Sequence, residues 1–373
     1  MKNVCVVTAT RAEYGLLRWT MDAIRSSGKL RLTVVATGAH LSPEYGHTVD
    51  NIFADGFAVD ECVECLISAY GAKSAALAMG LLGVRIGDVF ERLKPDILLV
   101  LGDRYELLPI CSAALVMGIP IAHMSGGDVT EGAFDDSVRN AITMMADIHF
   151  PGTEESAGRI AAMRGPEARI VVAGEPGIEN YVRLAPYPRA SLAAELGVPL
   201  KAKWTLFTYH PETRGDPKRD RHRVESLLGI LAGRRDVVTI ATYANADPGG
   251  AEINALLEDF AQRFPKQIVA HRSLGQERYL RTMRESWCVV GNSSSGIVEA
   301  PYTRTPCVDI GARQRGRFKD KNVVSCDVEG FDAALNRIDE ADFRERLSAC
   351  GGHYGDGRTS SVVVAELERW AGV

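Results

Sequence analysis

The sequence predicts an α/β protein made of two Rossmann-like, doubly wound domains. Short apolar runs rich in valine, isoleucine and leucine recur along the chain, and their composition is that of strands buried on both faces of a sheet. Helical stretches alternate with these runs, an order typical of a parallel sheet. At 373 residues the chain is too long for one ordinary core and suits two domains of similar size.

The first half of the chain is expected to form one domain over residues 1–175. Its strands are expected at residues 3–8, 32–36, 97–101, 119–123, 146–150 and 168–173. Helices are expected to begin near residue 16 and to span 73–93 and 154–163. Lys94-Pro95-Asp96 ends the second of these, because proline cannot continue a helix.

The second half repeats the alternation after a break. Gly174-Glu175-Pro176-Gly177 and the polar stretch up to Pro188 indicate the linker. The strands that follow are expected at residues 205–209, 237–242, 288–290 and 307–310. We therefore expect a second domain over residues 176–355 and a C-terminal segment, 356–373, that contains an amphipathic helix.

Composition and charge narrow the class of protein. The net charge of -5 and the lack of a basic run give no reason to expect nucleic-acid binding. The first residues lack the pattern of a signal peptide, and no apolar run reaches the ~18 residues of a membrane helix, so a cytoplasmic protein is expected. Most of the eight cysteines lie in apolar strands, where they act as small hydrophobic residues. Cys62-Val63-Glu64-Cys65 is a C-x-x-C motif without a second such motif, which favours a structural role over a metal or redox role.

Acidic residues follow two neighbouring strands of the first half. Asp103 follows the strand at 97–101, Asp128 follows the strand at 119–123, and Glu131, Asp135 and Asp136 come next. Ligands of open parallel sheets bind at the carboxyl ends of the strands. Clustered carboxylates raise one another's pKa and provide a general acid or base, or they bind Mg²⁺; helix capping is a third interpretation, sufficient for Asp136 only.

Two basic residues follow other strands of the same half. Arg11 lies in a strand-to-helix loop, where an arginine holds phosphate or forms a surface ion pair. His40 follows the second strand and is either an acid/base group or a hydrogen-bonded loop histidine. The dinucleotide fingerprint G-x-G-x-x-G is missing from the first loop.

The second half contains a turn, Gly291 to Gly296, that favours phosphate binding. Its three serines and flanking glycines offer hydroxyls and free N–H groups to an anion. Glu299, one helical turn later, suits hydrogen bonds from ribose hydroxyls, and His210 and Arg313 end other strands of the sheet. Together the two halves predict an enzyme that acts on a nucleotide-linked small molecule in a cleft between its domains.

The motifs resemble those of the hydrolysing UDP-N-acetylglucosamine 2-epimerases of sialic-acid-type sugar pathways. The matching pieces occur in the family's order within residues 8–317: T-A-T-R-A-E-Y-G, T-G-A-H-L-S-P-E-Y-G, L-G-D-R-Y-E, G-G-D-V-T-E-G-A-F-D-D-S-V-R-N-A-I, Y-H-P-E-T, G-N-S-S-S-G-I-V-E and G-A-R-Q-R-G-R. The resemblance implies a GT-B fold whose final helix packs on the first domain. It also implies a homo-oligomer, a dimer or tetramer, that needs no metal and no nicotinamide cofactor.

The family's reaction has two steps. UDP leaves C1 as a proton is taken from C2, which gives a 2-acetamidoglucal, and water then adds to yield the free manno sugar. By resemblance the catalytic residues are Asp103, Asp128 and Asp135, to which we add His40 from its position. The resemblance assigns binding of the UDP-sugar to Arg11, Arg104, His210, Asn245, Ser273, Leu274, Ser293, Ser294, Glu299 and Arg313.

The chain departs from the family pattern at two positions, and several functions compete. Many members have glutamate in place of Asp128 and histidine in place of Asn140, so the assignment of acid and base is open. A non-hydrolysing 2-epimerase would have proline in place of Ala12; a GT-B glycosyltransferase and a non-catalytic nucleotide-sugar sensor are further alternatives. UDP-N-acetylglucosamine is the expected substrate, giving N-acetylmannosamine, with UDP-2,4-diacetamido-2,4,6-trideoxyglucose of the legionaminic acid pathway as the alternative.

Overall fold

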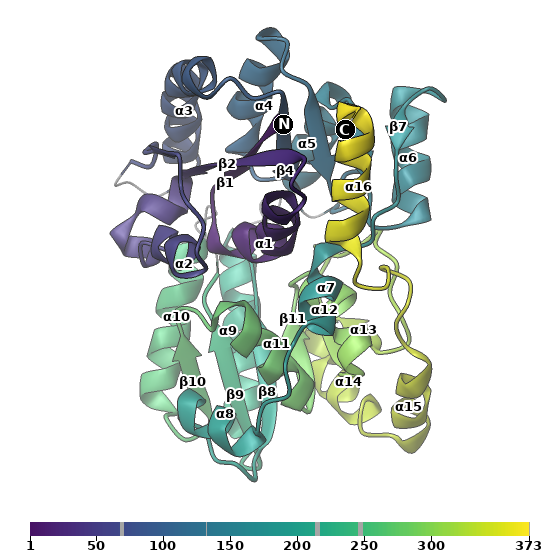
Figure 1. Cartoon of the computed structure of the whole chain (residues 1–373). Coiled ribbons are helices and arrows are strands. Elements are labelled where there is room, and N and C mark those ends of the chain that lie inside the picture. Colours follow the sequence, from purple (N-terminus) through teal and green to yellow (C-terminus); the bar gives the residue numbers. More distant parts are fainter. Residues whose placement is uncertain (68–70, 132, 213–216, 245–248, 373) are drawn as a thin grey trace. The chain divides into compact units, whose positions relative to one another are not determined.

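The computed structural model describes residues 1–67, 71–131, 133–212, 217–244 and 249–372 (Figure 1). The chain divides into two compact units. The first comprises Met1–Asp128, Asp135–Asn180 and His353–Val373, and the second comprises Val129–Phe134 and Tyr181–Gly352. Each unit contains one parallel sheet covered by helices, so the predicted α/β, doubly wound class is confirmed.

The first unit has a seven-stranded sheet in the order β3-β2-β1-β4-β5-β6-β7. Its strands are β1 (Lys2–Thr8), β2 (Leu30–Thr37), β3 (Glu61–Val63), β4 (Ile97–Leu101), β5 (Ile121–Met124), β6 (Ile148–Phe150) and β7 (Arg169–Ile170). Its helices are α1 (Arg11–Ser26), α2 (Val49–Ala54), α3 (Ala72–Leu93), α4 (Leu107–Val116), α5 (Asp135–Met145), α6 (Glu154–Arg164) and α16 (Thr359–Ala371), and α7 (Pro176–Val182) spans the boundary between the two units. From β1 the strands β2 and β3 are added toward one edge of the sheet, and β4 to β7 are added toward the other. The point between β1 and β4 is therefore the topological switch point, where ligands of such folds bind.

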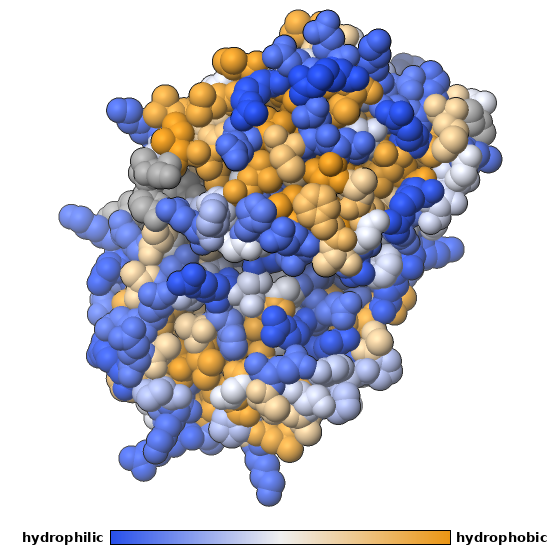
Figure 2. Space-filling view, turned by 60° about the vertical axis from the view of Figure 1, so that its left-hand side comes forward, coloured by the Kyte–Doolittle hydropathy of each residue, from blue (hydrophilic) through white to orange (hydrophobic). Residues whose placement is uncertain are grey.

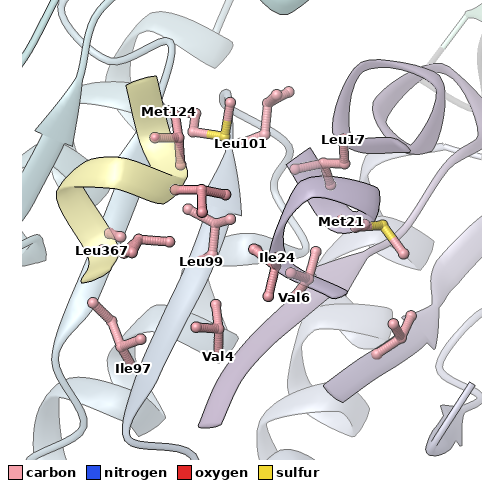
Figure 3. Packing of buried hydrophobic residues seen from close by; sticks show 14 of the residues in the cluster. Val4, Val6, Leu17, Met21, Ile24, Ile97, Leu99, Leu101, Met124 and Leu367 are labelled. Carbon is pink, nitrogen blue, oxygen red and sulfur yellow. The ribbon is translucent and has the colours of Figure 1, made fainter. Parts of the chain in front are cut away.

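One core of the first unit lies between this sheet and the helices α1 and α16, which pack against each other (Figure 3). Alternate residues of β1, Val4 and Val6, face this core because side chains of a strand alternate between its two faces. The C-terminal helix contributes Val363 and Leu367, both fully buried. The final segment of the chain therefore completes the core that begins with β1.

The second unit has a six-stranded sheet in the order β10-β9-β8-β11-β12-β13. Its strands are β8 (Lys203–Thr208), β9 (Val237–Thr242), β10 (Ile268–His271), β11 (Cys288–Gly291), β12 (Cys307–Ile310) and β13 (Val323–Cys326). Its helices are α8 (Arg189–Leu196), α9 (Pro217–Gly233), α10 (Gly250–Arg263), α11 (Gly275–Glu285), α12 (Ser295–Val298), α13 (Ala300–Thr303), α14 (Phe331–Arg337) and α15 (Ala341–Arg346). Its switch point lies between β8 and β11.

Three strands, β3, β10 and β13, were not expected from the sequence. All three are short and lie at an edge of their sheet, and most of their residues are only partly buried, so no apolar run marks them. β3 contains Cys62, which is exposed, whereas Cys65 is buried against the hydroxyl of Thr37; both are free thiols.

The surface of the first unit is partly apolar. Five large apolar side chains of α3 and of the end of α4 are about half exposed or more: Leu77, Leu81, Val84, Leu115 and Val116. Figure 2 shows, in orange, where apolar residues reach one face of the surface. No helix in the described part of the chain is both long and apolar enough to cross a membrane.

Candidate active site

A buried arginine organises the carboxyl edge of the first sheet. Arg139 on α5 is 1% exposed, and its Nη2 forms an ion pair with Oδ2 of Asp103, which follows β4. Its Nη1 donates to the backbone oxygen of Asp128 over 2.9 Å and lies 3.5 Å from Oδ1 of Asp136. The carboxylate cluster predicted from the sequence thus contains its own counter-charge, which offsets part of the expected repulsion.

Asp128 is fixed against the first turn of α6. It is 6% exposed, and its Oδ1 accepts a hydrogen bond of 2.7 Å from the hydroxyl of Ser156. The preceding residue, Gly127, has φ +77°, and a β-carbon there would lie 2.3 Å from the backbone oxygen of Ser156. Glycine is therefore required for this approach. The side chain of Asp103, by contrast, remains 28% exposed.

Asp135 is the first residue of α5, where a carboxylate is favoured by the helix dipole, and its side chain is half-buried. The residues between Asp128 and Asp135 group with the second unit, and Glu131 is among them. Asp103, Asp128 and Asp135 thus all belong to the first unit, and Arg139 joins the carboxylate of Asp103 to the backbone of Asp128, whereas Glu131 groups with the second unit.

Arg11 begins α1, next to the N-cap residue Thr10. Burial lowers the pKa of the Arg11 guanidinium. Within the described residues Arg11 has no acidic partner, so the ion pair considered as the alternative is not formed there. A half-buried cation at a strand-to-helix loop suits an anionic ligand.

A buried carboxyl group lies behind Arg11. Glu13 accepts a hydrogen bond of 2.6 Å from the backbone N–H of Ala9, and burial raises its pKa to about 7. Its backbone N–H donates to the hydroxyl of Thr10, the N-cap, over 3.3 Å. The residues Thr10 to Glu13 have the spacing of a capping box, which places this carboxyl under the loop of Arg11.

His40 is fully buried in the turn Gly38–Leu41 after β2. Its Nε2 lies 3.1 Å from the hydroxyl of Thr8, and its Nδ1 lies 2.9 Å from the hydroxyl of Thr48. Burial lowers the pKa of His40 to about 4, so the ring is neutral at pH 7. This is the arrangement of the hydrogen-bonded loop histidine, one of the two interpretations left open by the sequence.

Arg104 is paired with an acidic neighbour. Its Nη2 lies 3.0 Å from Oε1 of Glu106, and its Nε lies 3.2 Å from Oε2. Glu106 is 1% exposed. A second ligand of Arg104 would therefore bind beside this ion pair.

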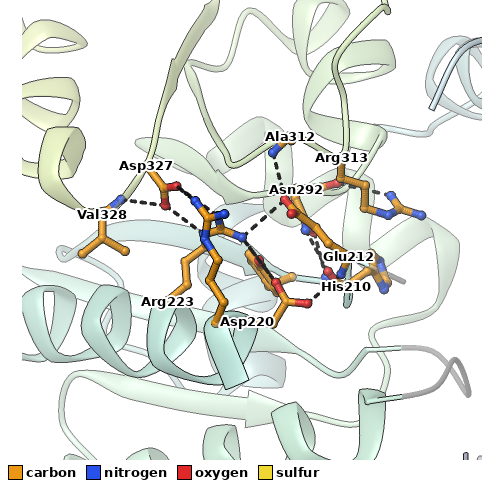
Figure 4. A network of polar contacts seen from close by, with 11 residues as sticks. His210, Glu212, Asp220, Arg223, Asn292, Ala312, Arg313, Asp327 and Val328 are labelled. Atoms are coloured by element: carbon orange, nitrogen blue, oxygen red, sulfur yellow. Dashed lines mark hydrogen bonds and ion pairs between the residues drawn. The ribbon is translucent and has the colours of Figure 1, made fainter. Parts of the chain in front are cut away.

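In the second unit, Asn292 links the loops that follow β8 and β11 (Figure 4). Its Oδ1 accepts from the backbone N–H of His210, and its Nδ2 donates to the backbone oxygen of His210, both over 2.7 Å. Asn292 is fully buried, and the preceding Gly291, at φ +138°, passes so close to β8 that a β-carbon would lie 1.9 Å from the oxygen of Thr208. The two loops at the switch point are thus held in one frame.

The loop after β12 is tied to the same asparagine. The backbone oxygen of Asn292 accepts from Nη1 of Arg313 over 3.3 Å and from Nε2 of Gln314 over 2.8 Å. The structure therefore brings His210 and Arg313, both predicted to bind the nucleotide, onto one residue (Figure 4). We call Asn292 and these bonded neighbours the Asn292 frame.

An ionic network around the buried Arg223 is joined to the loop after β12, which carries Arg313. Oε1 of Glu212 accepts from the backbone N–H of Ala312 over 2.8 Å and lies 3.3 Å from Nη1 of Arg223. Arg223 also donates to both carboxylate oxygens of Asp327, over 2.8 and 2.9 Å (Figure 4). Such a two-point pair holds its partners in one orientation.

The serine turn leads into α12, a helix of only four residues. The hydroxyls of Ser293 and Ser295 lie 3.0 Å apart, and that of Ser295 lies 2.7 Å from the hydroxyl of Tyr279. The hydroxyl of Ser294 has no partner within the described residues. Of the three serines, Ser294 is therefore the one available to a ligand.

Glu299 is buried next to this turn. It is 8% exposed, and burial raises its pKa to about 7. Its Oε2 has no hydrogen-bond partner among the described residues, so the side chain retains a buried acceptor for a donor supplied by a ligand.

The remaining predicted binding residues lie after β9 and β10. The hydroxyl of Ser273 accepts from the backbone N–H of Gly275 over 2.9 Å, and Leu274 is buried at the start of α11. Asn245 lies outside the described residues. Among those residues no group of three or more His, Cys, Asp or Glu side chains is arranged to bind a metal ion.

Three residues of this site had no role assigned from the sequence. The capping-box spacing from Thr10 could have revealed Glu13. Asn292 belongs to a motif, but its pairing with His210 joins residues far apart in the chain. The same is true of Arg139 and Asp103, so only the fold reveals these pairs.

Comparison with known proteins adds an independent line of evidence. The family described as UDP-N-acetylglucosamine 2-epimerase matches residues 22–368. A GDP/UDP-N,N'-diacetylbacillosamine 2-epimerase (hydrolyzing) from Campylobacter jejuni is 35% identical over 92% of this chain and 89% of its own length. A UDP-N,N'-diacetylbacillosamine 2-epimerase (hydrolyzing) from Legionella pneumophila is 32% identical over 96% of this chain and 94% of its own. The polysialic acid biosynthesis protein P7 of Escherichia coli is 30% identical over 88% and 83%.

Solved structures agree in fold at lower identity. UDP-GlcNAc 2-epimerase from Neisseria meningitidis bound to UDP-GlcNAc matches with a TM-score of 0.83 and 17% identity, over 99% of this chain and 100% of that one. The S. aureus MnaA-UDP co-structure matches with a TM-score of 0.82 and 18% identity, over 100% and 97%. The expected GT-B architecture is thereby confirmed, and the chain belongs to the UDP-N-acetylglucosamine 2-epimerase family.

Proposed function

We propose that the protein is a hydrolysing 2-epimerase that converts a UDP-linked 2-acetamido sugar into UDP and the free manno sugar. The observation that carries this proposal is that one buried arginine, Arg139, forms an ion pair with the carboxylate of Asp103 after β4 and donates to the backbone oxygen of Asp128 after β5. Acid/base chemistry at C2 needs carboxylates held in fixed and unequal surroundings. The carboxylate of Asp128 is buried and accepts a hydrogen bond from the hydroxyl of Ser156, whereas the carboxylate of Asp103 is partly exposed and forms an ion pair with Arg139.

The reaction proceeds in two balanced steps. A carboxylate takes the proton from C2, the C1–O bond breaks, and its electron pair leaves with UDP, giving a 2-acetamidoglucal. Water then adds its hydroxyl to C1, and C2 receives a proton on the opposite face. Asp103, Asp128 and Asp135 supply the acid and base groups, and His40 is a positioning residue that holds Thr8 and Thr48. Both steps are redox-neutral and call for no nicotinamide.

The second unit binds the nucleotide in this proposal. His210, Arg313 and the hydroxyl of Ser294 contact the diphosphate, whose negative charge grows as the C1–O bond breaks. The unpaired oxygen of Glu299 accepts from the ribose hydroxyls. The segment at Ser273 and Leu274 contacts uracil through its backbone. Arg11 and Arg104 of the first unit supply further cations for the diphosphate.

The names of the relatives favour one substrate. The relatives at 35% and 32% identity are named for N,N'-diacetylbacillosamine, the 2,4-diacetamido-2,4,6-trideoxy sugar. A relative named UDP-N-acetylglucosamine 2-epimerase, from Neisseria meningitidis, is 24% identical over 98% of this chain. We therefore propose UDP-N,N'-diacetylbacillosamine as the substrate. UDP-N-acetylglucosamine is the second candidate, because protein P7 at 30% belongs by name to polysialic acid biosynthesis.

A proton NMR time course in D₂O tests the proposal. The purified protein is incubated with each UDP-sugar, and with the GDP-linked form of the diacetamido sugar, since one relative is named for both nucleotides. The expected result is free UDP and a manno sugar with deuterium at C2, formed fastest from UDP-N,N'-diacetylbacillosamine. A higher kcat/KM for UDP-N-acetylglucosamine would reverse the choice of substrate.

Other products would contradict the hydrolysing reaction itself. An intact UDP-linked manno epimer would indicate a non-hydrolysing 2-epimerase. UDP release that requires an added acceptor would indicate a glycosyltransferase. Binding of UDP, seen by calorimetry, with every sugar nucleotide unchanged would indicate a sensor.

A further inference from the structure

The residues between Asp128 and Asp135 belong to a different unit from the two aspartates themselves. Asp128 is fixed within the first unit by Ser156 and Arg139, and Asp135 starts α5 of that unit. The intervening segment, of which Val129 is the first residue, groups with the second unit. A displacement of Val129 is therefore passed directly to Asp128, because consecutive Cα atoms are fixed about 3.8 Å apart.

Within the second unit, Val129 is seated on Gly316. A β-carbon built on Gly316 would lie 2.5 Å from Cγ1 and 3.0 Å from Cβ of Val129. Gly316 has φ +85°, a conformation that other residues rarely adopt. Oε1 of Glu131 lies 3.7 Å from the same point. Both the backbone and the available space at this position thus require glycine.

Gly316 is close in sequence to the Asn292 frame. It lies three residues after Arg313 and directly follows the turn Ala312–Arg315, which is closed by a 3.0 Å hydrogen bond from the N–H of Arg315 to the oxygen of Ala312. Gln314, between them, is 1% exposed and donates to the oxygen of Asn292. The loop that carries the diphosphate contact Arg313 is therefore the loop on which Val129 rests.

We propose that the contact between Gly316 and Val129 couples binding of the nucleoside diphosphate to the placement of Asp128, which makes Val129 a positioning residue. This inference rests on the proposed function. An anion at Arg313 restricts the loop after β12, that loop restricts Val129, and the backbone transmits the restriction to the carboxylate one residue earlier.

Three variants test the contact. Val129→Ala removes Cγ1 and leaves the loop of Arg313 intact, so kcat is expected to fall about 10–100-fold, because a misplacement of about 1 Å costs on the order of 10²-fold. The Kd for UDP is expected to stay near the wild-type value. Val129→Thr keeps the branched shape and is expected to retain most turnover. Gly316→Ala is expected to lower kcat in the same way, and the double variant with Val129→Ala is expected to recover part of it.

Gly197→Ala is the matched control for backbone strain. Gly197, at the end of α8, has φ +67°, but a β-carbon there would meet nothing within 4 Å. This variant carries a similar conformational cost without a contact and is expected to keep the wild-type kcat. Thermal unfolding of each variant shows whether it folds, and if Gly316→Ala does not, Val129→Ala and Val129→Thr decide.

The outcomes separate this inference from the proposed function. Wild-type protein that converts no sugar nucleotide contradicts the proposed function. Wild-type turnover together with unchanged kcat in Val129→Ala contradicts the coupling alone. A loss of UDP affinity in Val129→Ala at unchanged kcat would show that the contact serves binding only.

Discussion

The Asn292 frame leads to a prediction whose size follows from its geometry. In Asn292→Asp, one carboxylate oxygen still accepts from the N–H of His210. The other oxygen replaces Nδ2 and faces the backbone oxygen of His210 over the former 2.7 Å bond. Leaving a buried acceptor without its donor costs about 1–3 kcal/mol. Since 1.4 kcal/mol is about a factor of ten, UDP affinity is expected to fall roughly 5–150-fold if the frame positions His210 and Arg313.

Calorimetric titration with UDP measures this effect, and Asn3→Asp is the matched control. Asn3 is also buried, its Nδ2 donates to Leu93 over 3.0 Å, and its Oδ1 accepts from Thr33 over 2.6 Å. It lies near the start of β1, away from the carboxyl edge of the sheet. Both variants are expected to unfold at lower temperature. If both also bind UDP with wild-type affinity, the frame is structural only and the reasoning is refuted.

Further predictions concern the other parts of the molecule. Asp103→Asn should lower kcat about 10²–10⁴-fold with little change in UDP affinity, as measured by the NMR assay and by calorimetry. Asp136→Asn is the control: Asp136 also pairs with Arg139, but this variant should lose far less kcat. Burial raises the pKa of Glu299 to about 7, so its carboxyl becomes protonated below about pH 7. Calorimetric titrations should therefore show UDP affinity falling by up to about tenfold per pH unit below pH 7, and Glu299→Gln should abolish this dependence. Burial raises the pKa of Glu13 from 4.5 to about 7, so the folded state binds this proton more tightly than the unfolded state. The free energy of unfolding should therefore decline by roughly 3 kcal/mol as the pH rises through this range. Measured by urea unfolding, the free energy of unfolding of Glu13→Gln should depend less on pH. Leu367→Ala should lower the free energy of unfolding of the first unit by about 2–5 kcal/mol without weakening UDP binding.

The sequence predicted the elements that are continuous and apolar. The strands β1, β4, β8 and β9 are buried along nearly their whole length, and a five-residue apolar run such as Ile97 to Leu101, between Pro95 and Gly102, favours a strand over a buried helix. The edge strand β13 was missed because none of its residues is fully buried and its composition is not distinctive. β7 has only two residues, where a strand over 168–173 was expected, because the rest of that run is not paired in the sheet.

The candidate site was predictable only in part, for a similar reason. Strand ends can be read from the sequence, so Asp103 and Asp128 could be placed on one edge before the structure was known. Their shared partner Arg139 lies 36 residues from Asp103, and no local pattern indicates which way a helical side chain faces in the fold. The environment of His40 was equally hidden, because its hydroxyl partners Thr8 and Thr48 come from separate segments.

The position of α16 has a consequence for biosynthesis. The apolar faces of β1 and α1 emerge early from the ribosome, but Val363 and Leu367, which cover them, are translated only after residues 181–352. At roughly 5–20 residues per second, that interval lasts on the order of ten to forty seconds. The nascent chain therefore has its second sheet complete while the first core is still open, and during this time chaperones and proteases have access to it.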